Sequence, residues 1–466
     1  MPGSGPESDG IPRGRIRRSA PVIRLAARST GEAVIDALRR RDPPPEVHAQ
    51  RAERYVEVLG RSKGALMKAG QMLSIVPIFS SADPINQGAF RAAMSRLQAD
   101  APPMAPELTA QVIRTELGDG PDALFCEFSY VPIAAASIGQ VHVARLHDGR
   151  PVAVKVQYPG VAAAIRSDLR NNELIAVLIQ LLQSVVPAIS RSDPKAVAAE
   201  ISQRITEELD YTLEASNQSM FADAYRNHPF IHIPDVIPDL STRRILTQEL
   251  AEGLRWADAL DAEQSLRNSW GEVIWRFAHG SLRRIGAFNA DPHPGNYVFH
   301  LDGSVSFLDF GCVKRMSPAL VHQVEHIFRA VVEEDAQAFW NALVEGGHID
   351  ATRGPTPEQL LEHYRVRYEM IRGPQPFTMT PDVMARMIES EYSLTGAAGT
   401  YLRSVKTAQE WIFFNRIEMG IYGVQAELRS SADCRAIVME MTLDGPPGSP
   451  LGEMDASYWM GRAGRY

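Results

Sequence analysis

Two Asp-Gly dipeptides, each placed between runs of strand-forming residues, constrain the fold of this chain most. Asp148-Gly149 lies within VHVARLHDGRPVAVKVQ, and Asp302-Gly303 lies within YVFHLDGSVSFLDF. An Asp-Gly pair between such runs is the strongest short-range signal for a β-hairpin. The sequence therefore predicts two hairpins, and each of them leads directly to residues that can carry chemistry.

The second hairpin is preceded by DPHPGN, Asp291 to Asn296, and followed by LDFG, which contains Asp309. Protein kinases show the same order: a catalytic-loop Asp, then an Asn, then the Asp of a DFG motif. Asn296 and Asp309 would supply the hard oxygen ligands that Mg²⁺ prefers, and Asp291 would orient an attacking group or accept its proton. Each motif alone is typical of a surface turn, but the combination predicts a nucleotide site.

The first hairpin carries Lys155 in its second strand, where Val154 and Val156 point to the opposite face. A single lysine on a strand is commonly a solvent-facing or edge residue. In a protein kinase, however, a lysine at this place reaches the α- and β-phosphates of the nucleotide. The pattern as a whole favours the second interpretation.

A run of alanines stands upstream, where a protein kinase has its glycine-rich loop. In IAAASIGQVHVA, Ala134, Ala135 and Ala136 replace flexible glycines, and only Gly139 remains. Because a Cβ atom narrows the allowed backbone angles, we expect a stiffer segment with altered phosphate handling. Ser137 could donate a hydrogen bond to a phosphate. Alone, AAAS would indicate only a turn of small residues.

The stretch SDPKAVAAEISQRITEELDYTLEASNQ predicts one long helix that begins at Asp193, with Pro194 in its first turn. Apolar residues repeat every four positions down to Leu213 and would form its buried stripe. Three acidic residues would share one face beside that stripe: Glu207, Asp210 and Glu214. One interpretation is a solvated acidic face. The kinase-like alternative pairs one carboxylate with Lys155 and requires another cation for the rest.

A second predicted helix, RYVEVLGRSKGALMKAGQMLSIV, contains Lys68, Gly70 and Gln71. A glycine inside a helix costs about 1 kcal/mol relative to alanine, so Gly70 indicates a close backbone approach. Lys68 and Gln71 share a face because they are three residues apart. We expect this helix to pack across the acidic face, with Lys68 near the carboxylates and Gln71 directed into the active site.

Length and composition limit the class of protein. The 466 residues suit two or three packed lobes, and 45% hydrophobic with 22% charged residues is typical of a soluble globular protein. The net charge of −8 argues against a nucleic-acid partner. Three scattered cysteines, Cys126, Cys312 and Cys434, favour a reducing, cytoplasmic compartment. No apolar run reaches the length of a membrane span, and the residues from Asp444 onward look like a loose tail.

The N-terminal region is strongly basic. Between Arg13 and Arg41 it holds nine arginines against Glu32 and Asp36. A solvated arm is one interpretation, and contact with an anionic membrane surface is the other. Any action on a membrane would therefore be peripheral.

The segments KAGQMLS, AAASIGQVH, VAVKVQYPG, EELDYTLEA, DPHPGN and FLDFG together resemble the signature of the UbiB (aarF) family of atypical protein-kinase-like proteins. The resemblance covers roughly residues 46–330. It implies an α+β, two-lobed protein-kinase-like fold with an N-terminal helical extension, which holds the KxGQ helix, and a mainly helical C-lobe. The implied domains are a basic, partly disordered arm (1–45), the helical extension (46–125), an N-lobe with inserted helices (126–250) and a C-lobe with the catalytic loop and DFG motif (251–466).

The resemblance also implies roles for individual residues. Catalysis would involve Asp291, Lys155, Lys68 and Gln71, and Mg²⁺ would bind Asn296 and Asp309. Nucleotide contacts would come from Ala134, Ala135, Ala136, Ser137, Lys155, Glu208, Asp210, Glu214, Glu249 and Leu250. In this scheme Glu214 pairs with Lys155, while Glu208 and Asp210 engage Lys68. Asn289 departs from the family pattern, because many members carry His two residues before the catalytic Asp.

Family members are associated with ATPase activity and with isoprenoid lipid and ubiquinone metabolism. The resemblance therefore implies an ATPase or atypical phosphotransferase that uses ATP, or ADP, with Mg²⁺. Its expected partners are the nucleotide, an isoprenoid lipid or anionic membrane surface, and a biosynthetic enzyme complex. The short passage from the DFG motif into VHQVEHIFRAVVEE leaves little room for an activation loop, which argues against protein substrates.

Two other functions remain open at this point. A pseudokinase could bind nucleotide and switch a lipid or protein complex without turnover. A phosphotransferase of the aminoglycoside or choline type would also lack an activation loop, but it would leave the Lys68 helix unexplained.

Overall fold

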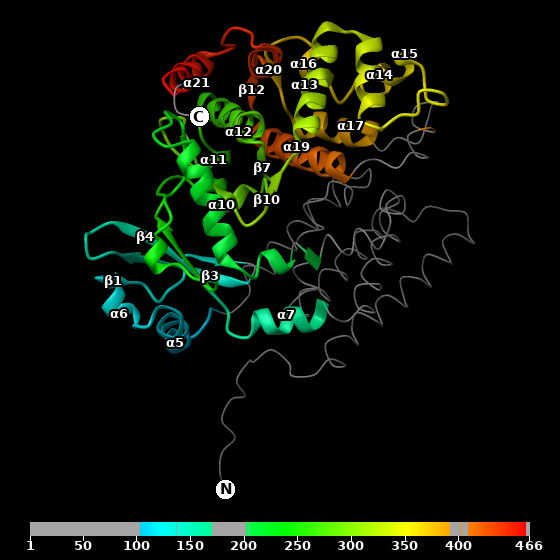
Figure 1. Ribbon diagram of the computed structural model, residues 1–466. Helices are drawn as coiled ribbons and strands as arrows, with labels where there is room; N and C mark the ends of the chain where they lie inside the picture. Colours follow the sequence, from blue (N-terminus) through cyan, green and yellow to red (C-terminus); the bar gives the residue numbers. More distant parts are fainter. Residues whose placement is uncertain are drawn as a thin grey trace, which may run out of the picture.

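The computed structural model describes residues 103–136, 138–169, 202–203, 205–391, 401 and 409–462, and these residues form two hydrophobic cores. A sheet-based lobe and a mainly helical lobe lie on either side of helix α10 (Tyr211–Ala224) (Figure 1). This arrangement confirms the predicted α+β, two-lobed fold. The predicted KxGQ helix, with Lys68 and Gln71, lies outside the described residues.

The sheet of the smaller lobe is built around the first predicted hairpin, which the structure confirms. Strands β3 (Gly139–Arg145) and β4 (Pro151–Gln157) pair antiparallel, and Gly149 takes φ +91° in their turn. The strand order is β1-β3-β4-β6, with β2 also paired to β3. The remaining strands are β1 (Glu127–Phe128), β2 (Ala134–Ala136) and β6 (Ile245–Glu249). Lys155 therefore lies on a strand that has neighbours on both sides.

Helices α5 (Pro106–Leu117) and α6 (Pro121–Leu124) precede this sheet in the chain. Val112 and Ile113 of α5 are buried in one core with Val154 and Val156 of β4. The alternation along β4 then places Lys155 on the other face of the sheet. The valines fill the core of the smaller lobe, and the lysine is left to face the larger one.

The predicted single helix through residues 193–218 is wrong in the part that the structure describes. The backbone of Asp210 is extended, with φ −129° and ψ 95°, and α10 begins afresh at Tyr211. The Asp210 carboxylate accepts hydrogen bonds from the backbone N of Thr212 at 3.1 Å and from its Oγ1 at 2.6 Å. A short acidic side chain that bonds the nearby backbone in this way caps a new helix rather than continuing an old one.

The break changes which residues are buried. Ile205 and Leu209 are buried as expected, but Leu213 is 48% exposed, because the second segment has its own orientation. Glu207 and Glu214 consequently belong to different helical segments and do not share the single face that the uninterrupted pattern predicts. Helix α7 (Val161–Leu169) lies between β4 and this region in the chain.

The second predicted hairpin is also confirmed. Strands β8 (Tyr297–Phe299) and β9 (Val305–Phe307) pair antiparallel, and β5 (Ile231–His232) adds to β9 in parallel. The sequence predicts one strand pair after residue 250, and this prediction is incomplete. Strands β7 (Ala287–Asn289) and β10 (Val313–Arg315) form a second pair, and β11 (Phe377–Thr378) and β12 (Ser431–Ala432) form a third.

Helices pack around these short strands to form the larger core. They are α11 (Trp256–Leu260), α12 (Gln264–Ile285), α13 (Pro318–Glu333), α14 (Ala336–Glu345), α15 (Pro357–His363), α16 (Glu369–Arg372), α17 (Pro381–Glu391), α19 (Gln409–Leu428), α20 (Cys434–Leu443) and α21 (Pro450–Met460). None of the described helices is both long and apolar enough to cross a membrane. The expectation of a loose C-terminal tail is wrong, because α21 packs against α12.

Candidate functional site

Lys155 lies at the meeting point of three chain segments. Its Nζ lies 2.9 Å from both Oε1 and Oε2 of Glu214, on α10, and 3.3 Å from Oδ2 of Asp309, just after β9. The side chains of Lys155 and Glu214 are 18% and 6% exposed, and that of Asp309 is 33% exposed. The structure thus brings together three residues to which the sequence assigns nucleotide and metal contacts.

The close packing of these charges moves their pKa values. Burial is the largest influence on Lys155 and lowers its pKa, but Asp309 and Glu214 together outweigh burial, so the pKa lies well above the ordinary value. Burial raises the pKa of Glu214 to about 7, Lys155 opposes this rise and Asp309 adds to it. Glu214 is therefore a carboxyl group that titrates near neutral pH.

Tyr211 is a neighbour of Lys155 that the sequence analysis missed. The Lys155 Nζ lies 5.0 Å from the centre of the Tyr211 ring, within the range of a cation–π contact. The ring is buried, and within the described part of the chain its hydroxyl has no hydrogen-bond partner. The signal was present in ELDYTLEA, where an aromatic residue follows the helix-capping Asp directly.

The catalytic-loop motif forms a tight turn between β7 and β8. The Asn296 Nδ2 donates to the backbone O of Asp291 and to its Oδ2, both at 3.1 Å. The Oδ1 of Asp291 is buried and has no hydrogen-bond partner among the residues that the structure describes. A buried acceptor left without a donor is unfavourable, so this oxygen is suited to bind a group that arrives with the substrate.

Asn289 connects the catalytic loop to the DFG segment. Its Nδ2 donates to the backbone O of Asp309 at 2.7 Å, and its Oδ1 accepts from the backbone N of Asp291 at 3.2 Å. The carboxylate of Asp309 is oriented in turn by the backbone N of Gly311, at 2.9 Å from Oδ1. Asn289 therefore positions both carboxylates, at the place where the family pattern has His.

Helix α10 is held against the DFG motif by two contacts. The Asn217 Nδ2 donates to the backbone O of Phe310 at 3.1 Å, and the rings of Phe221 and Phe310 lie 5.0 Å apart. Sequence reasoning missed Asn217, although it lies three residues after Glu214 and so shares its helix face. The position of Glu214 is thereby coupled to that of Asp309.

The alanine segment is a regular strand. Ala134 pairs with Val141 and Ala136 pairs with Gly139, so the segment is the first strand of a hairpin with β3. A Cβ atom on Gly139 would lie 2.2 Å from the backbone O of Val156, which makes this glycine a requirement of strand packing. Ala134 and Ala135 are exposed, as the prediction of nucleotide contact requires, while Ser137 lies outside the described residues.

The remaining predicted residues lie around this centre. Asp210 caps α10 and forms an ion pair with the Nε of Arg243 at 3.2 Å. Glu208 contributes negative charge that raises the pKa of Glu214. The predicted partner of both carboxylates, Lys68, lies outside the described residues, as does Gln71.

Glu249 and Leu250 end strand β6 at the junction between the lobes. The Oε2 of Glu249 accepts from the backbone N of Asp235 at 3.2 Å, and its Oε1 lies 3.8 Å from the Nη1 of Arg150. The backbone N of Leu250 donates to the O of Pro151 at 3.1 Å. These contacts direct the Glu249 carboxylate toward Arg150 and Asp235.

The site residues fit the Mg²⁺-nucleotide complex that the sequence predicts. Asp309 and Asn296 supply oxygen atoms, and Lys155 supplies a cation for phosphate. The segment from Gly311 to Ser317 contains only β10, and α13 begins at Pro318 with Ser317 as its N-cap. This segment is too short to form the peptide-binding platform of a protein kinase.

Comparisons with known proteins agree with this geometry. A family model described as the ABC1 atypical kinase-like domain matches residues 96–343. Protein ACTIVITY OF BC1 COMPLEX KINASE 7, chloroplastic, from Arabidopsis thaliana is 34% identical over 255 residues, which are 54% of this chain and 36% of that protein. Atypical kinase COQ8B, mitochondrial, from Rattus norvegicus is 32% identical over 340 residues, 70% of this chain and 61% of that protein.

A solved structure is similar over most of the chain. The complex of Rv3197 with erythromycin, from Mycobacterium tuberculosis, superposes with a TM-score of 0.61 and 28% sequence identity, and the match covers 85% of this chain and 96% of that one. The chain spans about a third of the length of the first curated relatives: 36% of ACTIVITY OF BC1 COMPLEX KINASE 7 and 34% of ACTIVITY OF BC1 COMPLEX KINASE 8, both from Arabidopsis thaliana.

Two glycines of α19 provide a test of how the catalytic loop is supported. A Cβ atom on Gly420 would lie 2.4 Å from the Cγ of Pro292, next to Asp291, whereas one on Gly423 would meet nothing within 4 Å. We expect Gly420→Ala to lower the free energy of unfolding by about 1–3 kcal/mol. Gly423→Ala should leave it unchanged or raise it by up to about 1 kcal/mol, since it only improves helix propensity. Urea denaturation measures both, and equal effects would contradict the close approach.

The raised pKa of Glu214 predicts a pH dependence of stability. Between about pH 4.5 and pH 7 the folded protein holds a proton that the unfolded chain releases, so the free energy of unfolding falls as pH rises through this range. Over this pH range, the free energy of unfolding of the wild type should fall by on the order of 2 kcal/mol more than that of Glu214→Gln.

Denaturation at several pH values measures this difference. The matched control is Glu127→Gln, which removes an exposed carboxyl on β1 that lies 3.4 Å from Arg145, and its free energy of unfolding should depend on pH as in the wild type. If the free energy of unfolding of Glu214→Gln also depended on pH as in the wild type, a group other than Glu214 would be responsible.

Proposed function

This chain belongs to the family of ABC1 atypical kinase-like domains, and we propose that it is an Mg²⁺-dependent ATPase or small-molecule phosphotransferase. One observation carries the proposal. Lys155 is held by a helix carboxylate and by the DFG carboxylate, and Asn289 ties the DFG segment to a catalytic-loop Asp whose buried Oδ1 has no partner among the described residues. This is the arrangement that phosphoryl transfer from a nucleotide requires.

Each residue has a defined task in this proposal. Lys155, oriented by Glu214, would hold the α- and β-phosphates, because its ammonium group is fixed on a central strand. Asp309 and Asn296 would hold Mg²⁺, which supplies neutralisation of the phosphate charge when bound. Asp291, kept in place by Asn296 and Asn289, would orient the attacking hydroxyl or water through Oδ1 and accept its proton.

The acceptor is proposed to be water or a small molecule rather than a protein. The short segment between Gly311 and Pro318 offers no platform for a peptide. From the family resemblance we propose that the chain serves isoprenoid lipid or quinone metabolism, in contact with an anionic membrane surface or a biosynthetic enzyme complex. The basic N-terminal arm supports the membrane contact through its arginines.

A nucleotide-switched module without turnover is the second candidate. It is favoured by the alanine strand β2, which pairs regularly with β3 and lacks the flexible glycines that fold over phosphates in a protein kinase. Tight nucleotide binding without phosphate release would support this candidate over the first.

The decisive experiment is Mg²⁺-dependent ATP binding and phosphate release by the purified protein, with and without anionic liposomes that carry a quinone-precursor mimic. We expect turnover to rise with liposomes.

Asp309→Asn should abolish Mg²⁺-nucleotide binding, because it removes the charged metal ligand. Asp119→Asn, an exposed position after α5, is the matched control. A wild-type protein that neither binds nor hydrolyses ATP would overturn the proposal, and an Asp309→Asn protein with normal affinity would overturn the metal assignment.

A further inference from the structure

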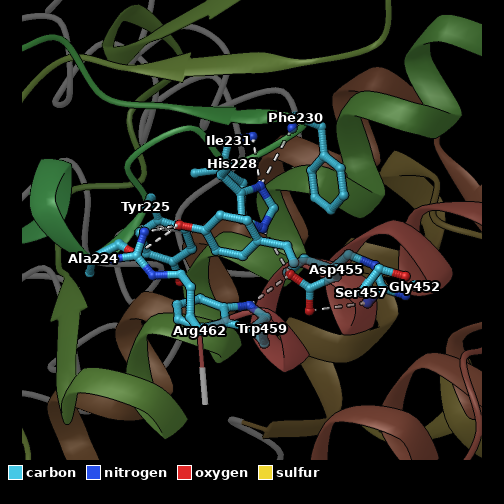
Figure 2. Close-up of polar contacts among 12 residues, drawn as sticks. Ala224, Tyr225, His228, Phe230, Ile231, Gly452, Asp455, Ser457, Trp459 and Arg462 are labelled. Carbon is cyan, nitrogen blue, oxygen red and sulfur yellow. Dashed lines mark hydrogen bonds and ion pairs between the residues drawn. The ribbon is translucent and has the colours of Figure 1, made fainter. Parts of the chain in front are cut away.

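The C-terminal helix α21 and the residues just after it cap the end of α10, the helix that carries Glu214. The Tyr458 hydroxyl lies 3.1 Å from the backbone O of Ala224 and 3.0 Å from that of Arg226. Arg462 donates to the O of Asp223 at 3.0 Å and to that of Arg226 at 3.1 Å. Carbonyl groups at a helix C-terminus lack partners within the helix, so these two side chains supply the missing donors. Figure 2 shows Arg462 directed at this end of α10, beside Ala224.

The same helix fixes the turn that follows α10. The Nε2 of His228 lies 2.9 Å from the Oδ1 of Asp455, and the Trp459 Nε1 donates to the same oxygen at 3.0 Å (Figure 2). The other ring nitrogen of His228 accepts from the backbone N of Phe230 and of Ile231. Burial lowers the pKa of His228, which favours the neutral ring that these contacts need, with the proton on Nε2. The imidazole of His228 thereby connects Asp455 to the start of β5 by hydrogen bonds.

The segment that α21 holds, from Asp223 to Ile231, lies in the sequence between Glu214 and Asp309, whose carboxylates hold Lys155. In one direction the chain runs back along α10 to Glu214. In the other it enters β5, which pairs in parallel with β9, and Asp309 lies two residues after the end of β9. A shift of this junction would therefore move both carboxylates relative to Lys155.

Helix α21 is itself firmly anchored to the larger lobe. Arg276 of α12 is 1% exposed and donates to both carboxylate oxygens of Glu440 at 2.8 Å, and its Nη2 donates to the Oγ of Ser449, the N-cap of α21, at 3.2 Å. A Cβ atom on Gly452 would lie 2.7 Å from the Nη2 of Arg276, so the first turn of α21 packs tightly. The helix can transmit the position of the large lobe to α10 because it is held at its other end.

We propose that Tyr458, Arg462 and Asp455 are positioning residues for the nucleotide site, acting through α10 and Glu214 on Lys155. The inference rests on the proposed nucleotide binding. It assigns the C-terminal segment a role in setting affinity for Mg²⁺-nucleotide, at a distance in sequence from every catalytic motif. The contacts of these three side chains are with the end of α10, with His228 after it, with one another or Trp459, and with Arg276 of α12, so we expect their effect on the site to pass through α10.

The test compares two hydroxyl deletions in α21. Tyr458→Phe removes only the hydroxyl, which bonds the end of α10 and accepts from the Nη1 of Arg462 at 2.8 Å. Ser457→Ala removes an exposed hydroxyl that bonds Glu453 within the same helix, and it serves as the control. Amide hydrogen exchange should rise about 3- to 10-fold in Tyr458→Phe along α10, from its last turn back to Glu214, and should not change in Ser457→Ala.

A double-mutant cycle then tests whether α21 acts on nucleotide binding through the Lys155–Glu214 ion pair. Tyr458→Phe should weaken Mg²⁺-ATP binding about 3- to 10-fold in the wild-type background and have no further effect in Glu214→Gln, because both changes act on one contact. Additive losses in the cycle, or faster exchange confined to the last turn of α10, would overturn the proposal. If the wild type binds no nucleotide, the proposed function fails, and the exchange measurement alone decides whether α21 positions α10.

Discussion

The contact of one partly buried ammonium group with two carboxylates is the interaction on which the rest of this structure depends. Lys155 comes from the sheet, Glu214 from α10 and Asp309 from the segment after β9, at sequence separations of 59 and 154 residues. An unpaired charge at so protected a position would be strongly unfavourable, so each partner requires the other two to be in place. The trio therefore fixes the small lobe, the connecting helix and the large lobe relative to one another.

The same trio explains why the site suits a further cation. Burial raises the pKa of Glu214 to about 7, Lys155 opposes this rise, and the second carboxylate, Asp309, adds to it. A divalent ion bound at Asp309 would relieve the repulsion between the carboxylates and leave Lys155 to the phosphates. Asp291, whose Oδ1 meets no donor from the described residues, lies in the motif that is tied to Asp309 through Asn289. Charge and hydrogen bonding thus support the same chemistry.

The sequence predicted the parts of this structure that local rules determine. Asp-Gly turns set both hairpins, and the hairpins place Lys155 and Asp309 on or beside their strands. The helix break at Asp210 was missed because the periodic apolar pattern ignores a side chain that bonds its own backbone. Strands β7 and β10 were missed because each has three residues and their pairing is not local. No periodicity marks such a pair.

The role of the C-terminal helix could not be predicted, because the hydrogen bonds that define it join residues more than 200 positions apart. It nonetheless bears on what positions the glutamate helix, given that the segment after the DFG motif is short. In protein kinases, the activation loop and its phosphorylation control the helix that carries the glutamate. Here the chain from Gly311 to Ser317 enters β10 and then a helix cap, so it has no length with which to do this. If Tyr458 and Arg462 position α10 as we propose, the Lys155–Glu214 pair depends on a segment that is itself anchored to the large lobe by the buried Arg276. Such an arrangement favours a permanently assembled site over a switched one, which agrees with the proposal of a small-molecule acceptor rather than a peptide.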